Sequence, residues 1–482
     1  MFLAHRIVDH TLLLLCPLDI SKGWAWIFAV ALLCGLAPTS RAVPSFARQT
    51  GMTCAACHTV FPELTPFGRE FKLNGYVLDN IKQVTGIDTS NRSTLALNAF
   101  APISLMAQIS YTHTSTALPD PTIGGALAKD GDLLFPQQVS FFYAGKIADE
   151  LGAFIQLTYS GVSDSFGFDN TDIRYAHHLS FGGVSGNDHS MILGVTLNNN
   201  PTVQDVWNTT PAWGYPYAGS ATAPTAMTSA KIDAGAGGFG QNVGGLGVYA
   251  WLDDHYYAEL TLYTSAVRGG AHPLDSSNNT VTQGVAPYAR VAYELRWDRN
   301  SLEVGAYGMS AHTHPGNGNA LAGPVDKYTD VAADIQYQFI GEDHLFTALG
   351  TYIHERQTLD GSVLDGFAAN TDNNLKTFKL MGQYYYHRKI GGSIGYFSTS
   401  GSSDALLYTP ASVTGSANNR PDTNGYILEL NYLPWLNTKL QAQYIGYQKF
   451  NGQNGNNPGG YDGSGRTASN NNTLYLLAWL NF

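Results

Sequence analysis

Charged side chains are scarce in this chain of 482 residues. Asp, Glu, Lys and Arg make up 13% of it, whereas a soluble globular domain is normally about a quarter charged. After residue 42 the chain also has no long apolar run. This excludes a further transmembrane helix, because a helix needs roughly 20 apolar residues to cross a bilayer. The composition is therefore typical neither of a soluble enzyme nor of a helical membrane protein.

Basic side chains are the minority among the charges. The chain has 26 Lys and Arg against 37 Asp and Glu, a net charge of -11. This balance argues against nucleic acid or anionic phosphate as a partner and is compatible with cations. No Gly-rich phosphate fingerprint stands between a predicted strand and a predicted helix, so no nucleotide cofactor is expected.

The first 42 residues have the features of a secretory signal peptide. An apolar tract covers residues 24–33 directly after Lys22, and residues 40–42 read Ser-Arg-Ala, with small residues at both recognition positions of a signal peptidase. The alternative is a membrane anchor, but the apolar tract is too short to span comfortably. We therefore expect residues 1–42 to be removed on export.

Cysteine is also rare, and its placement is informative. The chain has four cysteines, and Cys16 and Cys34 lie in the expected signal peptide. The other two stand in the pattern C-x-x-C-H formed by Cys54, Cys57 and His58, the attachment signature of a c-type haem. The alternative is a redox or metal-binding C-x-x-C with an accidental histidine, but no second ligand pair completes a zinc site. We expect one covalently attached haem c, with thioether bonds at Cys54 and Cys57 and His58 as axial ligand of the iron.

The rest of the chain alternates between apolar and polar residues. In residues 289–297, 330–339 and 378–387, one face is aliphatic and aromatic and the other carries Arg, Glu, Asp, Gln and Lys. A period of two is that of a strand, and an apolar outside around a charged lumen is typical of a transmembrane β-barrel. The alternative, a soluble β-sandwich, would carry more charge on its outward face.

Sixteen such segments are predicted, which gives a mainly β fold with a 16-stranded barrel. They lie near residues 102–113, 137–146, 152–160, 171–180, 190–199, 241–251, 256–266, 286–297, 301–312, 328–339, 344–355, 374–387, 391–399, 424–432, 438–449 and 472–482. Short turns alternate with long Gly- and Asn-rich loops, as in outer-membrane barrels, and an even strand count returns both ends to the periplasm. The final strand ends on Phe482, which resembles the signal of barrel assembly. We expect a protein of the bacterial outer membrane, in contact with its lipid.

The longest connection covers residues 200–240 and holds several Trp, Tyr and Pro residues. A loop of this length is usually functional or disordered. Two interpretations stay open: a constriction folded into the lumen, as in many 16-stranded porins, or an external loop.

Three regions follow: a signal peptide at 1–42, a monohaem cytochrome c segment at 43–92 and a porin-like barrel at 93–482. In the haem segment, Thr65 as N-cap, Pro66 at the first helical position and Gly75 after the end predict a short helix. Arg69 and Lys72 of this helix either pair with haem propionates or only face solvent.

The residues around the haem motif carry a family resemblance. Residues 44–53 read PSFARQTGMT and residues 61–68 read FPELTPFG; together with the motif they resemble the fused monohaem cytochrome–porins of iron-oxidising bacteria. The resemblance implies Cys54 and Cys57 as thioether residues and His58 as axial ligand. It also implies an iron oxidoreductase that oxidises extracellular Fe(II). Single electrons then pass across the outer membrane to a periplasmic cytochrome c or blue-copper protein.

Two further functions stay open on the sequence. One is a diffusion porin with a haem plug that gates or senses, and the other is a conduit that carries electrons outward to an extracellular acceptor. The distal ligand of the haem iron is open as well. Met52 is the only methionine within 43–92 and lies too close to Cys54 to reach the opposite haem face. The ligand is then absent, a group other than Met or His, or a barrel residue. The barrel candidates are Met106, Met309, Met381, His113, His177, His178, His312, His314, His354 and His387, unless these are ordinary interior or surface residues.

Overall fold

The computed structural model of the chain describes residues 44–87, 93–119, 128–129, 131–182, 188–235, 237–265, 281–315 and 323–482. The expected signal peptide, residues 1–42, falls outside these ranges and stays a prediction. None of the helices in the described ranges is long and apolar enough to cross a membrane.

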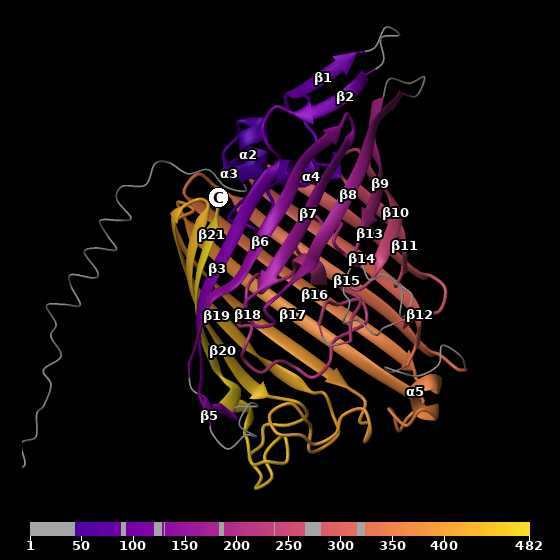
Figure 1. Cartoon of the computed structure of the whole chain (residues 1–482), viewed down its shortest axis with the longest axis vertical. Helices are drawn as coiled ribbons and strands as arrows, with labels where there is room; N and C mark the ends of the chain where they lie inside the picture. The colour runs from indigo at the N-terminus through magenta and orange to yellow at the C-terminus, as the bar shows by residue number, and fades with distance from the viewer. Residues whose placement is uncertain are drawn as a thin grey trace, which may run out of the picture. The chain divides into compact units, whose positions relative to one another are not determined.

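Sixteen long antiparallel strands close into one barrel (Figure 1). The first of them, β3, pairs with the last, β21, from Thr473 opposite Thr114 to Asn481 opposite Met106. Every predicted segment overlaps one of these strands, so the predicted fold class is confirmed. The strands are β3 (Ile103–Thr114), β6 (Asp132–Ala148), β7 (Leu151–Ser160), β8 (Ser165–Gly182), β9 (Asp188–Asn198), β10 (Gly244–Leu252), β11 (Tyr256–Thr264), β13 (Ala286–Trp297), β14 (Asn300–His314), β15 (Asp326–Ile340), β16 (His344–Thr358), β17 (Asp372–Tyr386), β18 (Ile390–Gly401), β19 (Thr423–Trp435), β20 (Thr438–Lys449) and β21 (Thr473–Asn481).

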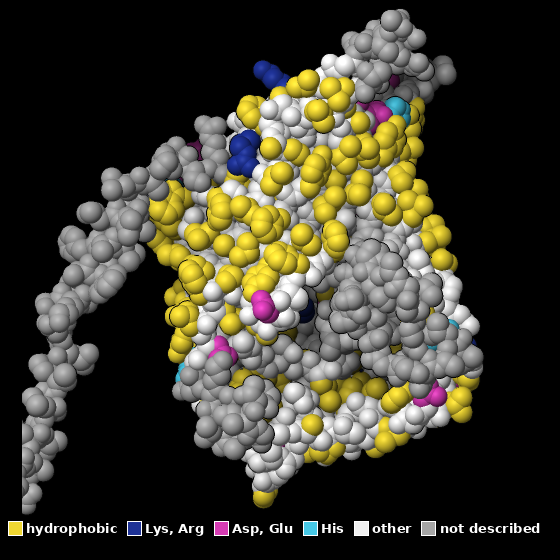
Figure 2. Space-filling view, in the orientation of Figure 1, with side chains coloured by type: hydrophobic (Ala, Val, Ile, Leu, Met, Phe, Trp, Pro, Cys, Tyr) yellow, Lys and Arg dark blue, Asp and Glu magenta, His cyan; other side chains and the backbone are white. Residues whose placement is uncertain are grey.

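The barrel has an apolar outside and a polar inside. In β13, Val291 is 58% exposed on the outer face, whereas its neighbour Arg290 is 1% exposed in the lumen. Hydrophobic side chains cover the outer face of the strands in Figure 2, with few charged ones among them. A soluble β-sandwich would place its apolar face inward, so this arrangement excludes one. The barrel belongs in the outer membrane, where lipid covers the apolar face.

The two ends of the barrel differ in their connections. At one end the strands are joined by short turns, for example residues 253–255, 298–299 and 341–343, and at the other by long connections such as 402–422 and 450–472. The short-turn end, at the top of Figure 1, also holds the N-terminal helices and the C-terminus. Because outer-membrane barrels have short periplasmic turns, this end faces the periplasm.

Three short helices precede the barrel: α2 (Pro44–Thr50), α3 (Cys54–Cys57) and α4 (Pro66–Leu73). We call residues 44–82 the plug. A hairpin of β1 (Gln83–Ile87) and β2 (Ser93–Asn98) links the plug to β3. The smaller elements of the described chain are β4 (Leu118–Pro119), β5 (Ala128–Lys129), β12 (Val281–Thr282), α5 (Asp360–Leu364) and the 3-10 turns η2 (Pro211–Trp213) and η3 (Ala468–Asn471).

Residues 199–243, between β9 and β10, form the longest connection, which we call the inner loop. It begins with a run of buried residues from Asn199 to Thr210. Trp207 and Ile232 are completely buried. Of the two interpretations of this segment, the constriction inside the lumen is therefore the correct one.

Candidate functional site

The C-x-x-C-H motif is held in a compact turn. The backbone N–H of His58 donates to the carbonyl of Cys54 (2.8 Å), and the N–H of Thr65 donates to the carbonyl of Cys57 (2.9 Å). The Thr65 hydroxyl donates to the carbonyl of Ala56 (2.6 Å) and accepts from the N–H of Gly68 (3.1 Å). Thr65 is therefore the N-cap of α4, as predicted, and it also ties this helix to the motif.

The His58 ring has one nitrogen engaged by the backbone. Its Nδ1 lies 3.2 Å from the carbonyl oxygen of Glu63, so Nδ1 carries the proton and donates, since a carbonyl only accepts. The neutral tautomer leaves the Nε2 lone pair available. Burial lowers the pKa of His58, against the opposing effect of the Glu63 and Pro62 backbone. A neutral imidazole with its other nitrogen fixed by a carbonyl is the usual state of a metal-ligating histidine.

The two cysteines adjoin this histidine and are not joined in a disulfide. Cys54 is buried and Cys57 is partly buried. Burial, and secondarily the neighbouring Cys54, raises the pKa of the Cys57 thiol to about 11. Cys57 is therefore a protonated thiol at neutral pH, not a nucleophile of the thiolate type.

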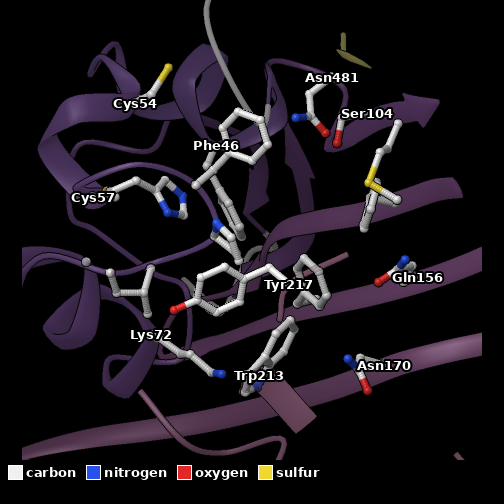
Figure 3. A pocket seen from close by; sticks show the side chains of 18 of the residues that line it. Phe46, Cys54, Cys57, Lys72, Ser104, Gln156, Asn170, Trp213, Tyr217 and Asn481 are labelled. Carbon is white, nitrogen blue, oxygen red and sulfur yellow. The ribbon is translucent and has the colours of Figure 1, made fainter. Parts of the chain in front are cut away.

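A cavity of about 470 Å³ opens beside the motif, between the plug, the inner loop and the barrel wall. Figure 3 shows Cys54, Cys57 and Lys72 on one side, with Ser104, Gln156 and Asn170 opposite. The remaining lining is mixed. Polar side chains such as Gln108, Gln138 and Asp169 stand beside aromatic ones: Phe46, Phe61, Phe71, Tyr76, Phe142, Phe154, Trp213, Tyr217 and Trp479. Its volume lies within the range of cofactor sites, roughly 300–1,000 Å³. Two thiols, an available imidazole nitrogen and an aromatic wall together fit a haem c.

Glu63 anchors the motif to the barrel wall. Its carboxylate accepts hydrogen bonds from Thr59 (3.0 Å), Tyr217 (2.8 Å), Thr347 (2.9 Å) and Gln383 (2.8 Å). Burial raises the pKa of Glu63, and these hydrogen bonds oppose the shift. The carbonyl that orients His58 therefore belongs to a residue fixed from four sides. No sequence pattern indicates this anchor, because three of the four partners lie on the inner loop, β16 and β17.

Arg69 and Lys72 hold the plug in place through protein partners. Arg69 is fully buried and pairs with Glu294 of β13 (2.6 Å), and it does not line the cavity. The Lys72 ammonium donates to the carbonyls of Val203 (2.7 Å) and Asp205 (2.8 Å) of the inner loop. Neither of the two expected roles, propionate pairing or a solvated helix face, describes Arg69. Lys72 does line the cavity, but the inner loop uses its donors.

Glu294 connects the plug with the inner loop. Besides Arg69, its carboxylate accepts from the Trp207 indole (2.8 Å) and from Arg296 (2.8 Å). Farther along β13, Arg290 pairs with Asp334 (2.6 Å) and more distantly with Asp205 (3.5 Å). The alternation in β13 correctly predicts that its charged side chains face the lumen. Their partners lie on other strands and on the inner loop, and no sequence pattern indicated these pairs.

Of the barrel candidates for a distal ligand, Met106 lines the cavity, as does Met52, which the sequence sets aside as too close to Cys54. Met309 and Met381 face the lumen, as predicted, and are buried elsewhere. The seven candidate histidines are not among the lining residues in the described chain. His177, for example, is exposed and pairs with Glu150 at the periplasmic rim (2.7 Å).

No protein-family model and no curated relative matches the chain. Among solved structures, it is similar to the outer membrane channel DcaP of Acinetobacter baumannii, with 13% identity over 79% of this chain and 96% of that one, at a TM-score of 0.42. It is also similar to a loop L8 deletion mutant of OmpT, an outer membrane protein of Vibrio cholerae, with 12% identity, coverage of 79% and 99%, and a TM-score of 0.42. A third similar structure is OmpF of Salmonella typhi in complex with daunomycin, with 13% identity over 79% of this chain and 97% of that one, at a TM-score of 0.41.

Proposed function

We propose that this chain is an outer-membrane electron-transfer protein. It accepts single electrons from extracellular Fe(II) and passes them to a periplasmic cytochrome c or blue-copper protein. The observation that carries the proposal is the C-x-x-C-H turn beside an aromatic cavity, with the Nε2 of His58 available. Cys54 and Cys57 would hold one haem c covalently and His58 would bind its iron. The bound group supplies one-electron chemistry.

The surrounding residues suit this role. The Glu63 carbonyl orients His58 (3.2 Å), and the aromatic side chains of the lining supply apolar contact surface beside the motif. The plug lies at the periplasmic end, where a soluble carrier has access. The excess of acidic residues, 37 against 26 basic ones, favours a cationic donor. A diffusion pore needs no haem attachment motif, and a soluble carrier needs no barrel.

A diffusion porin is the second candidate, and the strand number favours it. Barrels of 16 strands are wide enough for an aqueous channel, and this chain forms a closed barrel of 16 strands. Against it stand the plug and the inner loop, which together occupy the lumen. An outward conduit shares every structural feature of the proposed inward path, and the reduction potential of the haem would separate the two directions.

The direct test adds Fe(II) anaerobically to the oxidised, detergent-purified protein at the growth pH of the organism. We expect the absorption bands of a reduced c-type haem without any flavin or nicotinamide. Cys57→Ala should show no covalently bound haem in a pyridine haemochrome assay, and His58→Ala should lose the transfer while the barrel still assembles. A wild-type haem that stays oxidised under excess Fe(II) would favour the haem-plugged porin.

A further inference from the structure

The cavity beside the motif has two walls of different origin. The plug supplies Cys57 and His58, and the inward row of β3 supplies Ser104, Met106 and Gln108. In Figure 3, Cys57 and Ser104 lie on opposite sides of the cavity. A planar cofactor attached at the motif would therefore have the barrel wall on the side away from the plug.

Met106 lies in the middle of that barrel wall. It is paired in register with Ser140 of β6, and the Ser140 hydroxyl accepts a hydrogen bond from Gln156 (3.1 Å). Both Ser104 and Gln156 face the cavity across from Cys57 in Figure 3. Met106 lines the same cavity, is 5% exposed and packs in the cluster that contains Phe61 and Phe142.

Methionine is the exception in its row. The inward residues of β3 are otherwise polar and buried: Ser104, Gln108, Ser110, Thr112 and Thr114. Met106 packs against Phe61 and Phe142, and it is the one inward residue of β3 that carries a sulfur atom. Thioether sulfur is an established axial ligand of haem iron in cytochromes c.

The other lining side chains that carry a ligating nitrogen or sulfur atom, His58, Lys72, Met52 and the two cysteines, all belong to the plug. His58 is the only histidine that lines it in the described chain. Lys72 donates to two inner-loop carbonyls and lies 4.5 Å above the Trp213 ring. Met52 belongs to the same short segment as Cys54, two residues away, on the plug side.

We propose that the Met106 thioether sulfur is the distal axial ligand of the haem, opposite His58. This inference rests on the proposed function, because it requires the haem at Cys54 and Cys57. The two axial ligands come from the plug and from the barrel, so the six-coordinate centre forms only when the plug is seated. A His/Met pair also raises the reduction potential, as an acceptor of electrons from Fe(II) requires.

The test compares Met106→Leu with Met52→Leu and Met381→Leu, three substitutions of similar volume at methionines. The readouts are the red charge-transfer band of a ferric iron–sulfur bond, the upfield-shifted methionine methyl resonance of the ferrous protein, and the reduction potential. We expect all three signatures in the wild type and both controls. Met106→Leu should lose the band and the resonance, and its potential should fall.

Met106→His should restore a six-coordinate spectrum at a lower potential than the wild type, which a merely structural role would not produce. Heat-dependent migration in SDS gels verifies that each variant retains a folded barrel. A wild-type protein with covalent haem but no methionine signature overturns the ligand assignment alone. So does a signature that Met52→Leu removes. A wild type without covalent haem overturns the proposed function instead.

Discussion

A single carbonyl oxygen decides which nitrogen of His58 is available. The Glu63 carbonyl lies 3.2 Å from Nδ1, so the free lone pair is on Nε2. Glu63 in turn is fixed by Tyr217, Thr347 and Gln383, which belong to the inner loop and two strands. The motif alone predicts the ligand, but the residues that orient it come from parts of the chain up to 320 positions away. No spacing rule could have found them.

Asp404 shows how a residue of the outer loops responds to pH. It is 1% exposed, and its carboxylate accepts from the backbone N–H groups of Ala369 (2.9 Å), Asn370 (2.9 Å) and Leu407 (2.9 Å). Burial alone would raise the pKa of Asp404, but these hydrogen bonds outweigh it and lower the pKa to about 2. Because the folded pKa lies below the ordinary value of 3.8, the contact stabilises the loops fully above about pH 4.

We predict that this stabilisation, about 2 kcal/mol, is lost as the pH falls from about 4 through about 2. Hydrogen-exchange protection of Ala369 and Asn370, corrected for the intrinsic rate, should be constant above that window and fall within it. Asp404→Asn should reduce the protection at neutral pH on the order of thirtyfold. Asp372→Asn, a change at an exposed acid of the same region, should leave it unchanged. Equal loss in both variants would disprove the role of Asp404.

At the scale of elements, α4 is the part that fastens the plug. Arg69 reaches Glu294 of β13, Ser301 of β14 and Gln338 of β15, and none of these side chains has appreciable solvent access. Without Arg69, Glu294 keeps Arg296 as a cationic partner, but the buried Ser301 and Gln338 each lose a hydrogen bond, and an unsatisfied buried polar group typically costs about 1–3 kcal/mol. The substitution therefore weakens the binding of α4 to the barrel, whereas the strands keep their own hydrogen bonds and stay paired.

We predict that Arg69→Met releases the plug without unfolding the barrel. Protease should cut within residues 44–82 much faster in this variant, while the barrel still migrates as a heat-modifiable species in SDS gels. Arg299→Met is the matched control. Arg299 pairs with Glu342 at 3.2 Å, but the two side chains are 54% and 85% exposed, and such pairs contribute about 0–1 kcal/mol. Unchanged proteolysis in Arg69→Met would show that α4 is held by other contacts.

The strands were predictable and the contents of the lumen were not. Alternation with a period of two located all sixteen strands, and the predicted bounds of β13 and β20 agree with those observed. This succeeds because lipid and lumen impose opposite polarity on neighbouring residues. The inner loop has no such period. Its position depends on individual contacts such as Trp207 with Glu294 (2.8 Å) and the Lys231 N–H with Glu355 (2.5 Å), which appear only once the strands are in place.

At the scale of the whole molecule, the plug contacts the barrel wall on all sides. Besides β13–β17, plug atoms bond to β6 through Ala144, to β8 through Asp172 and to β10 through Tyr249. On the remaining side, Lys439 of β20 donates to the Phe61 carbonyl (2.9 Å). The inner loop crosses the lumen beyond the plug. Two layers, the plug and the inner loop, therefore lie within the lumen.

We therefore predict low ion conductance for the wild type in planar lipid bilayers. A variant without residues 44–98 should conduct more, and one that also lacks residues 203–238 should show the open steps of a 16-stranded channel, because the lumen then holds neither layer. Each variant keeps residues 1–42 for export, and heat-dependent SDS migration confirms its barrel. The order of the three conductances is the decisive quantity. If the wild type conducts as well as the doubly deleted variant, the two layers do not block the lumen, and the diffusion porin becomes the better account.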